Sequence, residues 1–231
     1  GEEGGVVSCL TELIAAQSIV KELSLRGNEL DSLAGVAIAR AVASNSSLKV
    51  LNLFDNRLGD EGAVAIAKAI RFNMSMSCVS LCKNGVGDEG ALAFAAIFKR
   101  LVETDELAEA RTTATAAVDV RNKWVGEFNK KMKKLKLTTE LDPVTPPPAA
   151  TDGPDGPESV GNSVLELVNL SANSIGPAAG LELAKAIGAA RAASETSMHG
   201  LALQMNDITE DADVDAIDEE LSQHQGFVLE L

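Results

Sequence analysis

Basic residues are scarce in this 231-residue sequence: Lys and Arg number 20 against 34 Asp and Glu, giving a formal net charge of −14. That balance excludes nucleic acid as the expected partner, because phosphate binding requires clustered Lys and Arg. The acidity is concentrated near the C-terminus, where residues 164–231 contain 2 basic and 12 acidic side chains, a charge of −10.

Cysteines and long apolar runs are also few. The three cysteines, Cys9, Cys78 and Cys82, are an odd number without CxxC spacing, which favours a reducing compartment over a secreted disulfide scaffold. No apolar run reaches the ~18 residues needed to span a bilayer. The N-terminal residues lack the basic and then apolar pattern of a signal peptide. We therefore expect a cytoplasmic protein, with the cilium or cytoskeleton as alternatives.

Catalytic motifs are missing as well. The sequence has no phosphate-loop, nucleophile-elbow or HExxH pattern, and its two histidines, His199 and His224, lie 25 residues apart. The letters GVGDEG at 85–90 match G-x-G-x-x-G, but they fall in the strand-to-helix turn of a repeat described next. The acidic run 207–220 lacks the glycine and glutamate of a calcium loop. We expect no enzyme, no cofactor and no metal ion.

An internal repeat dominates the sequence. Five segments fit L-x-x-L-x-L-x-x-N-x-L with aliphatic or Met substitutions: VKELSLRGNEL (20–30), LKVLNLFDNRL (48–58), MSCVSLCKNGV (76–86), LELVNLSANSI (165–175) and MHGLALQMNDI (198–208). Their asparagines are spaced 28, 28, 89 and 33 residues apart. An apolar pattern at helical spacing follows several of them, as in GDEGAVAIAKAI (59–70). Each unit is therefore predicted to be a strand, a turn and a helix.

These motifs resemble the leucine-rich repeat family, in its ribonuclease-inhibitor-like subtype shared by the Ran GTPase-activating protein, the NOD-like receptors and tropomodulins. The resemblance covers about residues 1–98 and 164–210. It implies an α/β solenoid with a curved parallel sheet inside and helices outside. The segment 1–14 resembles the helical half of a further unit, which would continue the array upstream. The Ran GTPase-activating family has more repeats, and its functional residues lie in loops without a match in this sequence, so none are carried over. The long insertion also departs from that family's pattern.

The repeat asparagines are predicted to be structural. Alternation in the strand sends Leu51 and Leu53 into the core and turns Asn52 and Phe54 toward the inner, concave face. An asparagine where the chain leaves the strand can satisfy the backbone groups of adjacent bends. We therefore expect one ladder of structural side chains, formed by Asn28, Asn56, Asn84, Asn173 and Asn206.

The concave face is the predicted partner-binding surface. Only two of its fifteen outward positions are charged, which favours a close, partly apolar partner. The alternative is that small residues merely fit the inner curvature. The candidate binding residues are Glu22, Arg26, Asn52, Phe54, Ser80, Leu167, Asn169 and Gln204.

Between Asn84 and Asn173 the chain has 61 residues more than one 28-residue repeat needs, and we assign an insertion to residues 99–163. Its first part lacks proline and is predicted to be a prolonged helix or a pair of helices. Its second part contains six of the seven prolines and is predicted to be an extended linker. Seven basic side chains surround an apolar stripe in residues 121–136. Three interpretations remain open: packing on the solenoid, docking on an acidic partner such as calmodulin or tubulin, or lying on an anionic membrane. The candidate residues are Trp124, Phe128, Lys131, Met132, Lys134 and Leu135.

The predicted organisation is thus repeats over 1–98, the insertion over 99–163, and continued repeats with an acidic C-terminal helix or cap over 164–231. Residues 226–231 are predicted to begin another strand. The favoured function is a non-enzymatic scaffold that binds another protein through the concave face, the basic insertion, or both. The alternatives are a regulator that activates a small GTPase and a structural subunit of a large cytoskeletal or ciliary assembly.

Overall fold

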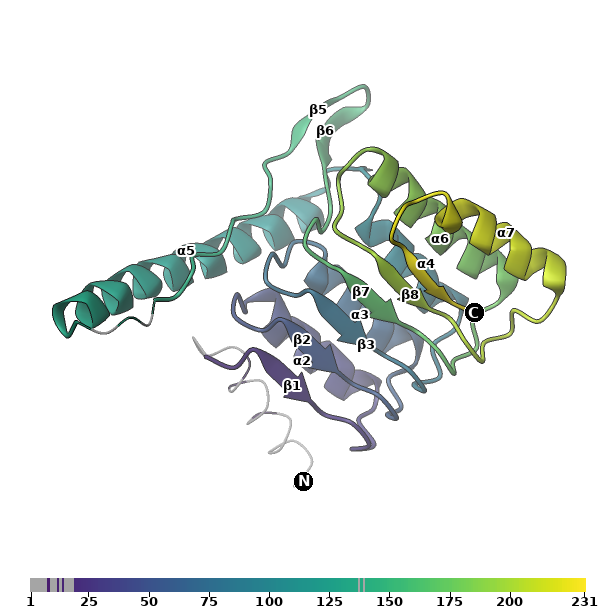
Figure 1. Cartoon of the computed structure of the whole chain (residues 1–231), viewed down its shortest axis with the longest axis horizontal. Helices are drawn as coiled ribbons and strands as arrows, with labels where there is room; N and C mark the ends of the chain where they lie inside the picture. The colour runs from purple at the N-terminus through teal and green to yellow at the C-terminus, as the bar shows by residue number, and fades with distance from the viewer. Residues whose placement is uncertain (1–7, 9–11, 13, 15–18, 137, 139) are drawn as a thin grey trace.

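The computed structural model describes residues 8, 12, 14, 19–136, 138 and 140–231. One parallel sheet runs through the repeats (Figure 1). Its six strands, in spatial order, are β1 (Glu22–Ser24), β2 (Val50–Asn52), β3 (Cys78–Ser80), β7 (Leu167–Asn169), β8 (Gly200–Ala202) and β9 (Val228–Glu230). The strand β3 pairs directly with β7, so the insertion leaves the array without interrupting the sheet.

Helices cover the outer face of this sheet. Each repeat strand up to β8 is followed by one of α2 (Ser32–Ala43), α3 (Gly59–Ile70), α4 (Asp88–Ile97), α6 (Pro177–Ala192) and α7 (Asp211–Ser222). The insertion begins only after α4 has ended, so the third repeat keeps its complete helix. The predicted α/β leucine-rich repeat fold, with a long helical insertion, is confirmed.

The core lies between the sheet and the helices. The repeat leucines Leu51, Leu53 and Leu58 are fully buried, which stabilises the fold by roughly 2 kcal/mol for each side chain. Helices α2 and α3 approach closely because glycines face each other. A Cβ atom added at Gly35 would lie 2.9 Å from a methyl group of Leu58 and 3.0 Å from Cα of Gly62. Larger side chains at this contact would push the two repeats apart.

The ends of the array differ in how much the structure describes. At the C-terminus, α7 occupies the acidic stretch where a helix is predicted, and β9 adds a strand beside β8. At the N-terminus, residues 8, 12 and 14 are helical. The remainder of the helical half predicted for residues 1–14 lies outside the described residues.

The insertion contains a helix and a small second sheet. Strand β4 (Leu101–Val102) leads into α5 (Asp105–Lys134), and the chain returns through β5 (Thr151–Gly153) and β6 (Gly156–Ser159). These strands form an antiparallel sheet in the order β4-β6-β5. The helix runs along the edge of the main sheet where the strands begin and projects beyond β1 (Figure 1). Among the described residues, no helix is long and apolar enough to cross a membrane.

The return segment corrects one prediction. Residues 140–150 are extended, as expected of a proline-rich linker, but residues 151–159 form a β-hairpin instead. The turn sequence Pro154-Asp155-Gly156 explains the difference, because Pro, Asp and Gly suit successive positions of a tight turn, and Gly156 has a φ of 131°. The hairpin is also anchored to β4, where the Glu103 amide donates to the Pro157 carbonyl at 2.6 Å.

Candidate functional site

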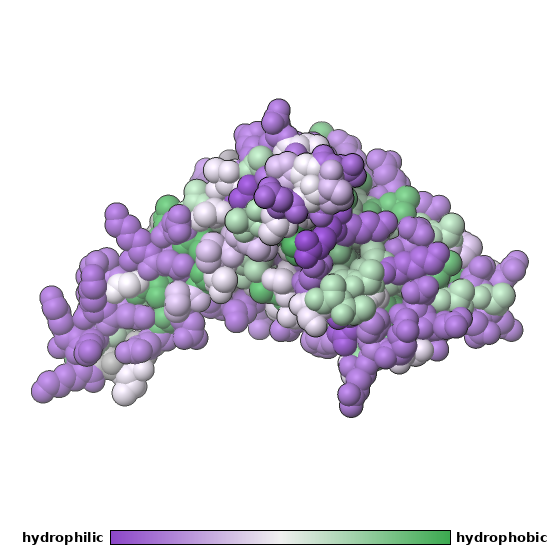
Figure 2. Space-filling view, turned by 90° about the horizontal axis from the view of Figure 1, so that it is seen from above, coloured by the Kyte–Doolittle hydropathy of each residue, from purple (hydrophilic) through white to green (hydrophobic). Residues whose placement is uncertain are grey.

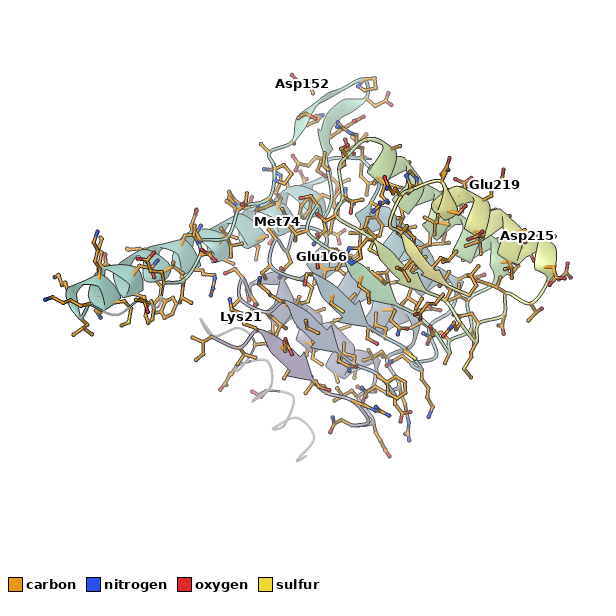
Figure 3. All side chains as sticks on the ribbon, viewed as in Figure 1. Lys21, Met74, Asp152, Glu166, Asp215 and Glu219 are labelled. Atoms are coloured by element: carbon orange, nitrogen blue, oxygen red, sulfur yellow. The ribbon has the colours of Figure 1, made fainter. Side chains whose placement is uncertain are left out.

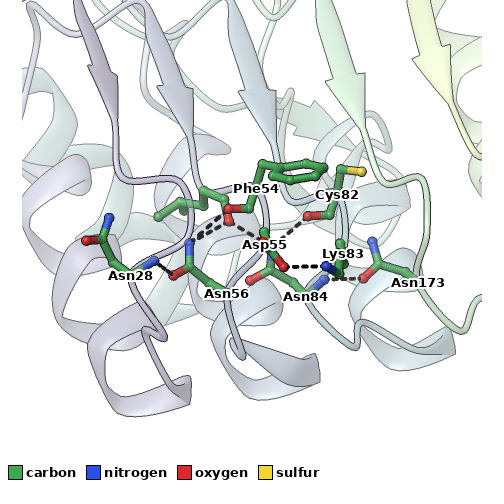
Figure 4. A network of polar contacts seen from close by, with 9 residues as sticks. Asn28, Phe54, Asp55, Asn56, Cys82, Lys83, Asn84 and Asn173 are labelled. Carbon is green, nitrogen blue, oxygen red and sulfur yellow. Dashed lines mark hydrogen bonds and ion pairs between the residues drawn. The ribbon is translucent and has the colours of Figure 1, made fainter.

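The predicted asparagine ladder runs along the edge where the strands end (Figure 4). Asn56 Oδ1 accepts from the backbone amides of Asn28 and Leu30, both at 3.0 Å, and its Nδ2 donates to the carbonyls of Leu25 and Leu53. Asn84, Asn173 and Asn206 repeat this pattern, each bonding to the preceding repeat. The side chain of the first rung, Asn28, is exposed and donates only to the Arg26 carbonyl in its own turn. The side-chain amides of the other four rungs are buried, bond to backbone groups and leave little capacity for a ligand: Asn56, Asn84, Asn173 and Asn206.

The residue before each ladder asparagine is held in a left-handed conformation. The φ values are 67° at Gly27, 59° at Asp55, 57° at Lys83, 53° at Ala172 and 58° at Met205. Such a conformation is costly for residues other than glycine. The ladder bonds hold the bend in place at each position and offset that cost.

A second ladder, which the sequence analysis missed, lies at the opposite edge, where the strands begin. Asn73 Nδ2 donates to the carbonyls of Val42 and Asn45, and its Oδ1 accepts from the amides of Ser75 and Met76. Asn45 and Asn162 occupy the equivalent positions in their repeats. The signal was present in the sequence, since these asparagines are spaced 28 and 89 residues apart, like Asn56, Asn84 and Asn173.

The backbone amides of the turn glycines also form hydrogen bonds between repeats. Asp60 Oδ1 accepts from the amides of Gly87 and Gly90 at 2.8 Å, so the carboxylate of one repeat caps the helix of the next. Asp88 caps Gly176 in the same way. The amides within the GVGDEG letters therefore bind a side chain of the protein itself, which accounts for that motif without a nucleotide.

The concave face carries the predicted binding residues at different degrees of exposure. Glu22, Arg26, Leu167 and Gln204 are exposed, whereas Asn52, Phe54, Ser80 and Asn169 are half-buried. The Arg26 guanidinium lies 4.3 Å from the Phe54 ring centroid, a cation–π contact that covers part of the ring. Asn52 and Asn169 use Oδ1 to accept from the amides two residues further on. Beside Leu167 the face is shallow, because Gly200 has no side chain and Ala202 is buried.

Two thiols line the same face. Cys78 is half-buried and Cys82 is buried, and both are free. Burial raises the pKa of each thiol, and the Glu166 carboxylate raises the pKa of Cys78 further. At neutral pH both side chains are therefore protonated and poor nucleophiles. In the described part of the chain, no group of His, Cys, Asp and Glu side chains is arranged to hold a metal ion.

The insertion packs with a different stripe from the one predicted. The buried side chains of α5 are Ala114, Val118, Arg121 and Val125. Of the predicted stripe, Trp124, Phe128 and Met132 are half-buried and Leu135 is exposed. Trp124 and Phe128 stack on each other with ring centroids 5.4 Å apart. The helix contacts a row of loops, where Ser46 Oγ donates to the Ala117 carbonyl, rather than a broad apolar surface.

The return segment is bound along α5. We call residues 140–150 the strap. Asn129 pairs with both backbone groups of Leu141 at 2.9 Å, and Asn122 with both backbone groups of Val144 at 2.8 Å. Seven helical residues span about 10.5 Å and three extended residues about 10 Å, so the two spacings match. The strap and the helix therefore form one unit.

The projecting end of α5 is basic. Lys131 and Lys134 are exposed, and the helix end is largely hydrophilic in Figure 2. At the opposite end of the insertion, Arg71 is buried and donates to the carbonyls of Ala96, Lys99 and Ser159. Burial lowers the pKa of Arg71 to about 10. Arg71 thus fastens both ends of the insertion to the solenoid.

Comparisons with known proteins agree with this architecture. A family model described as a leucine-rich repeat matches residues 44–67 and 72–95, which contain β2 and β3. These two segments therefore match the leucine-rich repeat, and the chain has a leucine-rich-repeat-like fold. Among solved structures, it is similar to one described as leiomodin-1 actin-binding site 2, with a TM-score of 0.56 and 13% identity over 94% of this chain and 88% of that chain. At this identity the likeness shows the fold alone. No match was found among curated proteins.

Proposed function

We propose that this protein is a non-enzymatic interaction module of the ribonuclease-inhibitor-like subtype, which binds a partner protein on the concave face of its sheet. The observation that carries the proposal is the character of that face. On β1, β2, β3, β7 and β8 it combines exposed and half-buried side chains with only two charges, Glu22 and Arg26. Strand β9 adds the exposed Val228 and a third charge, Glu230, on a chain whose net charge is −14.

The geometry favours a partner with a small apolar contact. Phe54, Leu167 and, on β9, Val228 are the larger apolar side chains, with smaller residues at Ser80 and Ala202. Leu167 is 38% exposed, so its burial by a partner would contribute on the order of 1 kcal/mol. The lysine-rich end of α5 supplies a second surface, suited to an acidic region of the same partner or of another protein.

The proposal is tested by site-specific photo-crosslinking in the intact protein. A photoreactive residue is placed at Ser80 on the concave face or, as the matched control, at the exposed Lys185 on α6. Partners found by co-purification and mass spectrometry are expected to crosslink from Ser80 and not from Lys185. The combined Phe54→Asp and Leu167→Asp variant is expected to lose the crosslink while keeping its circular dichroism spectrum. Equal crosslinking from both positions would contradict a concave binding site.

Actin is a second candidate partner, favoured by the similarity to the leiomodin-1 actin-binding site. Such binding would also fit a structural role in a cytoskeletal assembly. Co-sedimentation with filamentous actin, and polymerisation of labelled monomeric actin, test the two forms of actin separately. Two combined variants would show which surface makes the contact: Phe54→Asp with Leu167→Asp on the concave face, and Lys131→Glu with Lys134→Glu on α5. Absence of both effects at tens of micromolar protein would exclude actin.

Activation of a small GTPase is the remaining alternative. It is tested by adding the intact protein to a panel of small GTPases and measuring GTP hydrolysis. The interaction-module proposal predicts no increase in rate. A reproducible increase that depends on a loop side chain would instead establish the regulator.

A further inference from the structure

Arg121 is a buried arginine without a partner. It lies in the middle of α5, on the side that faces the solenoid, and is 6% exposed. Its Nε is fully buried and has no hydrogen bond. In the part of the chain that the structure describes, no hydrogen bond or ion pair reaches the other guanidinium nitrogens. Buried charges are normally paired, so an isolated one requires an explanation.

The other buried or half-buried arginines show what a structural role looks like in this protein. Arg71 donates to three backbone carbonyls, Arg191 donates to the carbonyls of Met198 and Gln225, and Arg111 pairs with Glu103 at 2.7 and 3.0 Å. Arg121 has the burial of Arg71 but none of these contacts. The fold therefore buries Nε of Arg121 without a hydrogen bond, as it does Nε of Arg71 and Arg191, but it gives the other guanidinium nitrogens of Arg121 no protein partner among the described residues.

A pocket of about 480 Å³ adjoins this guanidinium. One wall is the loop between α2 and β2, which contributes the hydroxyls of Ser44 and Ser46. The other wall is α5, which contributes Val120 and Trp124 beside Arg121. The hydroxyls of Ser44 and Ser46 already donate to the carbonyls of Ala41 and Ala117, so the Arg121 guanidinium supplies the donors that the pocket offers to an anion. The pocket thus joins an apolar surface to a cation. Its volume suits a small ligand.

The surrounding charge is positive. Lys21 lies at the start of β1, on the same edge as the insertion (Figure 3). Its pKa is lowered, chiefly by burial and then by the positive charges of Arg121 and Lys49, with Asp142 acting in the opposite direction. Burial also lowers the pKa of Arg121. Lys21 therefore lies within electrostatic range of both Arg121 and Lys49.

We propose that this pocket binds a small amphipathic anion, whose carboxylate or phosphate group pairs with Arg121 and whose apolar body lies against Val120 and Trp124. The planar guanidinium forms bidentate bonds with such groups. The bound anion compensates the buried charge that the protein leaves unpaired. The site lies at the edge where the strands begin, apart from the concave face, so its test is independent of the partner proposed for that face.

The chain contains a single tryptophan, and it lines this pocket. The intrinsic fluorescence of Trp124 in the full chain therefore reports on the site directly. Three probes separate the possible sources of the anion: N-acetyl-leucine as a carboxylate with an apolar side chain, its uncharged amide, and inorganic phosphate. A saturable fluorescence change is expected with N-acetyl-leucine at lower concentration than with phosphate, and none with the amide.

Two variants connect the signal to the geometry. Arg121→Met keeps a long side chain without charge and is expected to weaken N-acetyl-leucine binding about 10- to 100-fold, the loss of a charge-assisted hydrogen bond. Ala116→Leu, on the α5 wall, narrows the pocket with a good helix former, leaves Arg121 in place, and is expected to weaken binding as well.

Thermal unfolding supplies a readout independent of fluorescence. Without ligand, Arg121→Met is expected to leave the melting temperature unchanged or higher, because it removes an unpaired buried charge, whereas the matched control Arg71→Met lowers it. N-acetyl-leucine raises the melting temperature of the wild type only. A marked drop for Arg121→Met, or equal binding of the acid and the amide, would overturn the proposal.

Discussion

The asparagine ladder is tested most directly at Asn173, which joins the repeats on either side of the insertion. Its Oδ1 accepts from the amides of Asn84 and Val86 at 2.9 and 3.0 Å. Its Nδ2 donates to the carbonyl of Leu81 at 3.0 Å and to that of Leu170 at 2.9 Å. The Leu170 carbonyl also accepts from Asn206, so it keeps a partner when Asn173 is replaced.

Replacing Asn173 with alanine therefore leaves three buried backbone groups without a partner: the amides of Asn84 and Val86 and the carbonyl of Leu81. Each such group costs about 1 to 3 kcal/mol, so Asn173→Ala is expected to lower the free energy of unfolding by at least about 3 kcal/mol. The measurement is urea unfolding followed by circular dichroism, with the slope of the transition compared between proteins. The matched control is Asn28→Ala, the exposed first rung, whose side chain donates only to Arg26. Its expected effect is within about 0.5 kcal/mol.

Two results would refute this reasoning. A cost below about 1 kcal/mol for Asn173→Ala would show that water replaces the amide freely, so the ladder would not be a main support of the fold. An equal cost at Asn28 would show that the effect comes from the local turn and not from bonds between repeats.

Three further predictions concern caps, the strap and the thiols. Asp60→Ala removes the cap from the first turn of α4 and is expected to cost about 1 kcal/mol in urea unfolding; no change would contradict capping between repeats. Asn122→Ala combined with Asn129→Ala is expected to speed hydrogen exchange at the two strap amides without affecting the main sheet, and unchanged exchange would show that other contacts hold the strap. In the Cys9→Ser variant, Cys78 and Cys82 are expected to be alkylated slowly at pH 8, because burial raises the pKa of both thiols. The alkylation rates are expected to level off only above pH 9.0, and a plateau below that pH would contradict the raised pKa values.

The repeat units could be predicted because their signal is local and periodic. The spacing of Leu51, Leu53 and Asn56 fixes which side chains enter the core and where the chain bends, and four further units repeat it. The pairing of β3 with β7 follows from the same register, since Val79 and Val168 occupy equivalent positions. The second ladder was within reach of the same comparison, because Asn45 and Asn73 share the 28-residue period.

The insertion was less predictable because its packing depends on a surface formed elsewhere in the chain. Helical periodicity indicates an apolar stripe through Trp124 and Phe128, yet the buried stripe passes through Val118 and Val125. On its buried side α5 meets the loop between α2 and β2, where Ser46 Oγ donates to the Ala117 carbonyl. The hairpin at 151–159 was obscured by the surrounding prolines, although the Pro-Asp-Gly turn was a usable signal.

The sequence by itself therefore determined the units, their order and the structural role of the repeat asparagines, because these depend on contacts repeated at a fixed spacing. Only the tertiary structure decided where the insertion lies, how Asn122 and Asn129 bind the strap, and that Arg121 is buried beside a pocket. Those features arise where segments far apart in the chain meet without a repeated pattern. Burial and charge pairing at such junctions depend on the arrangement of the whole fold.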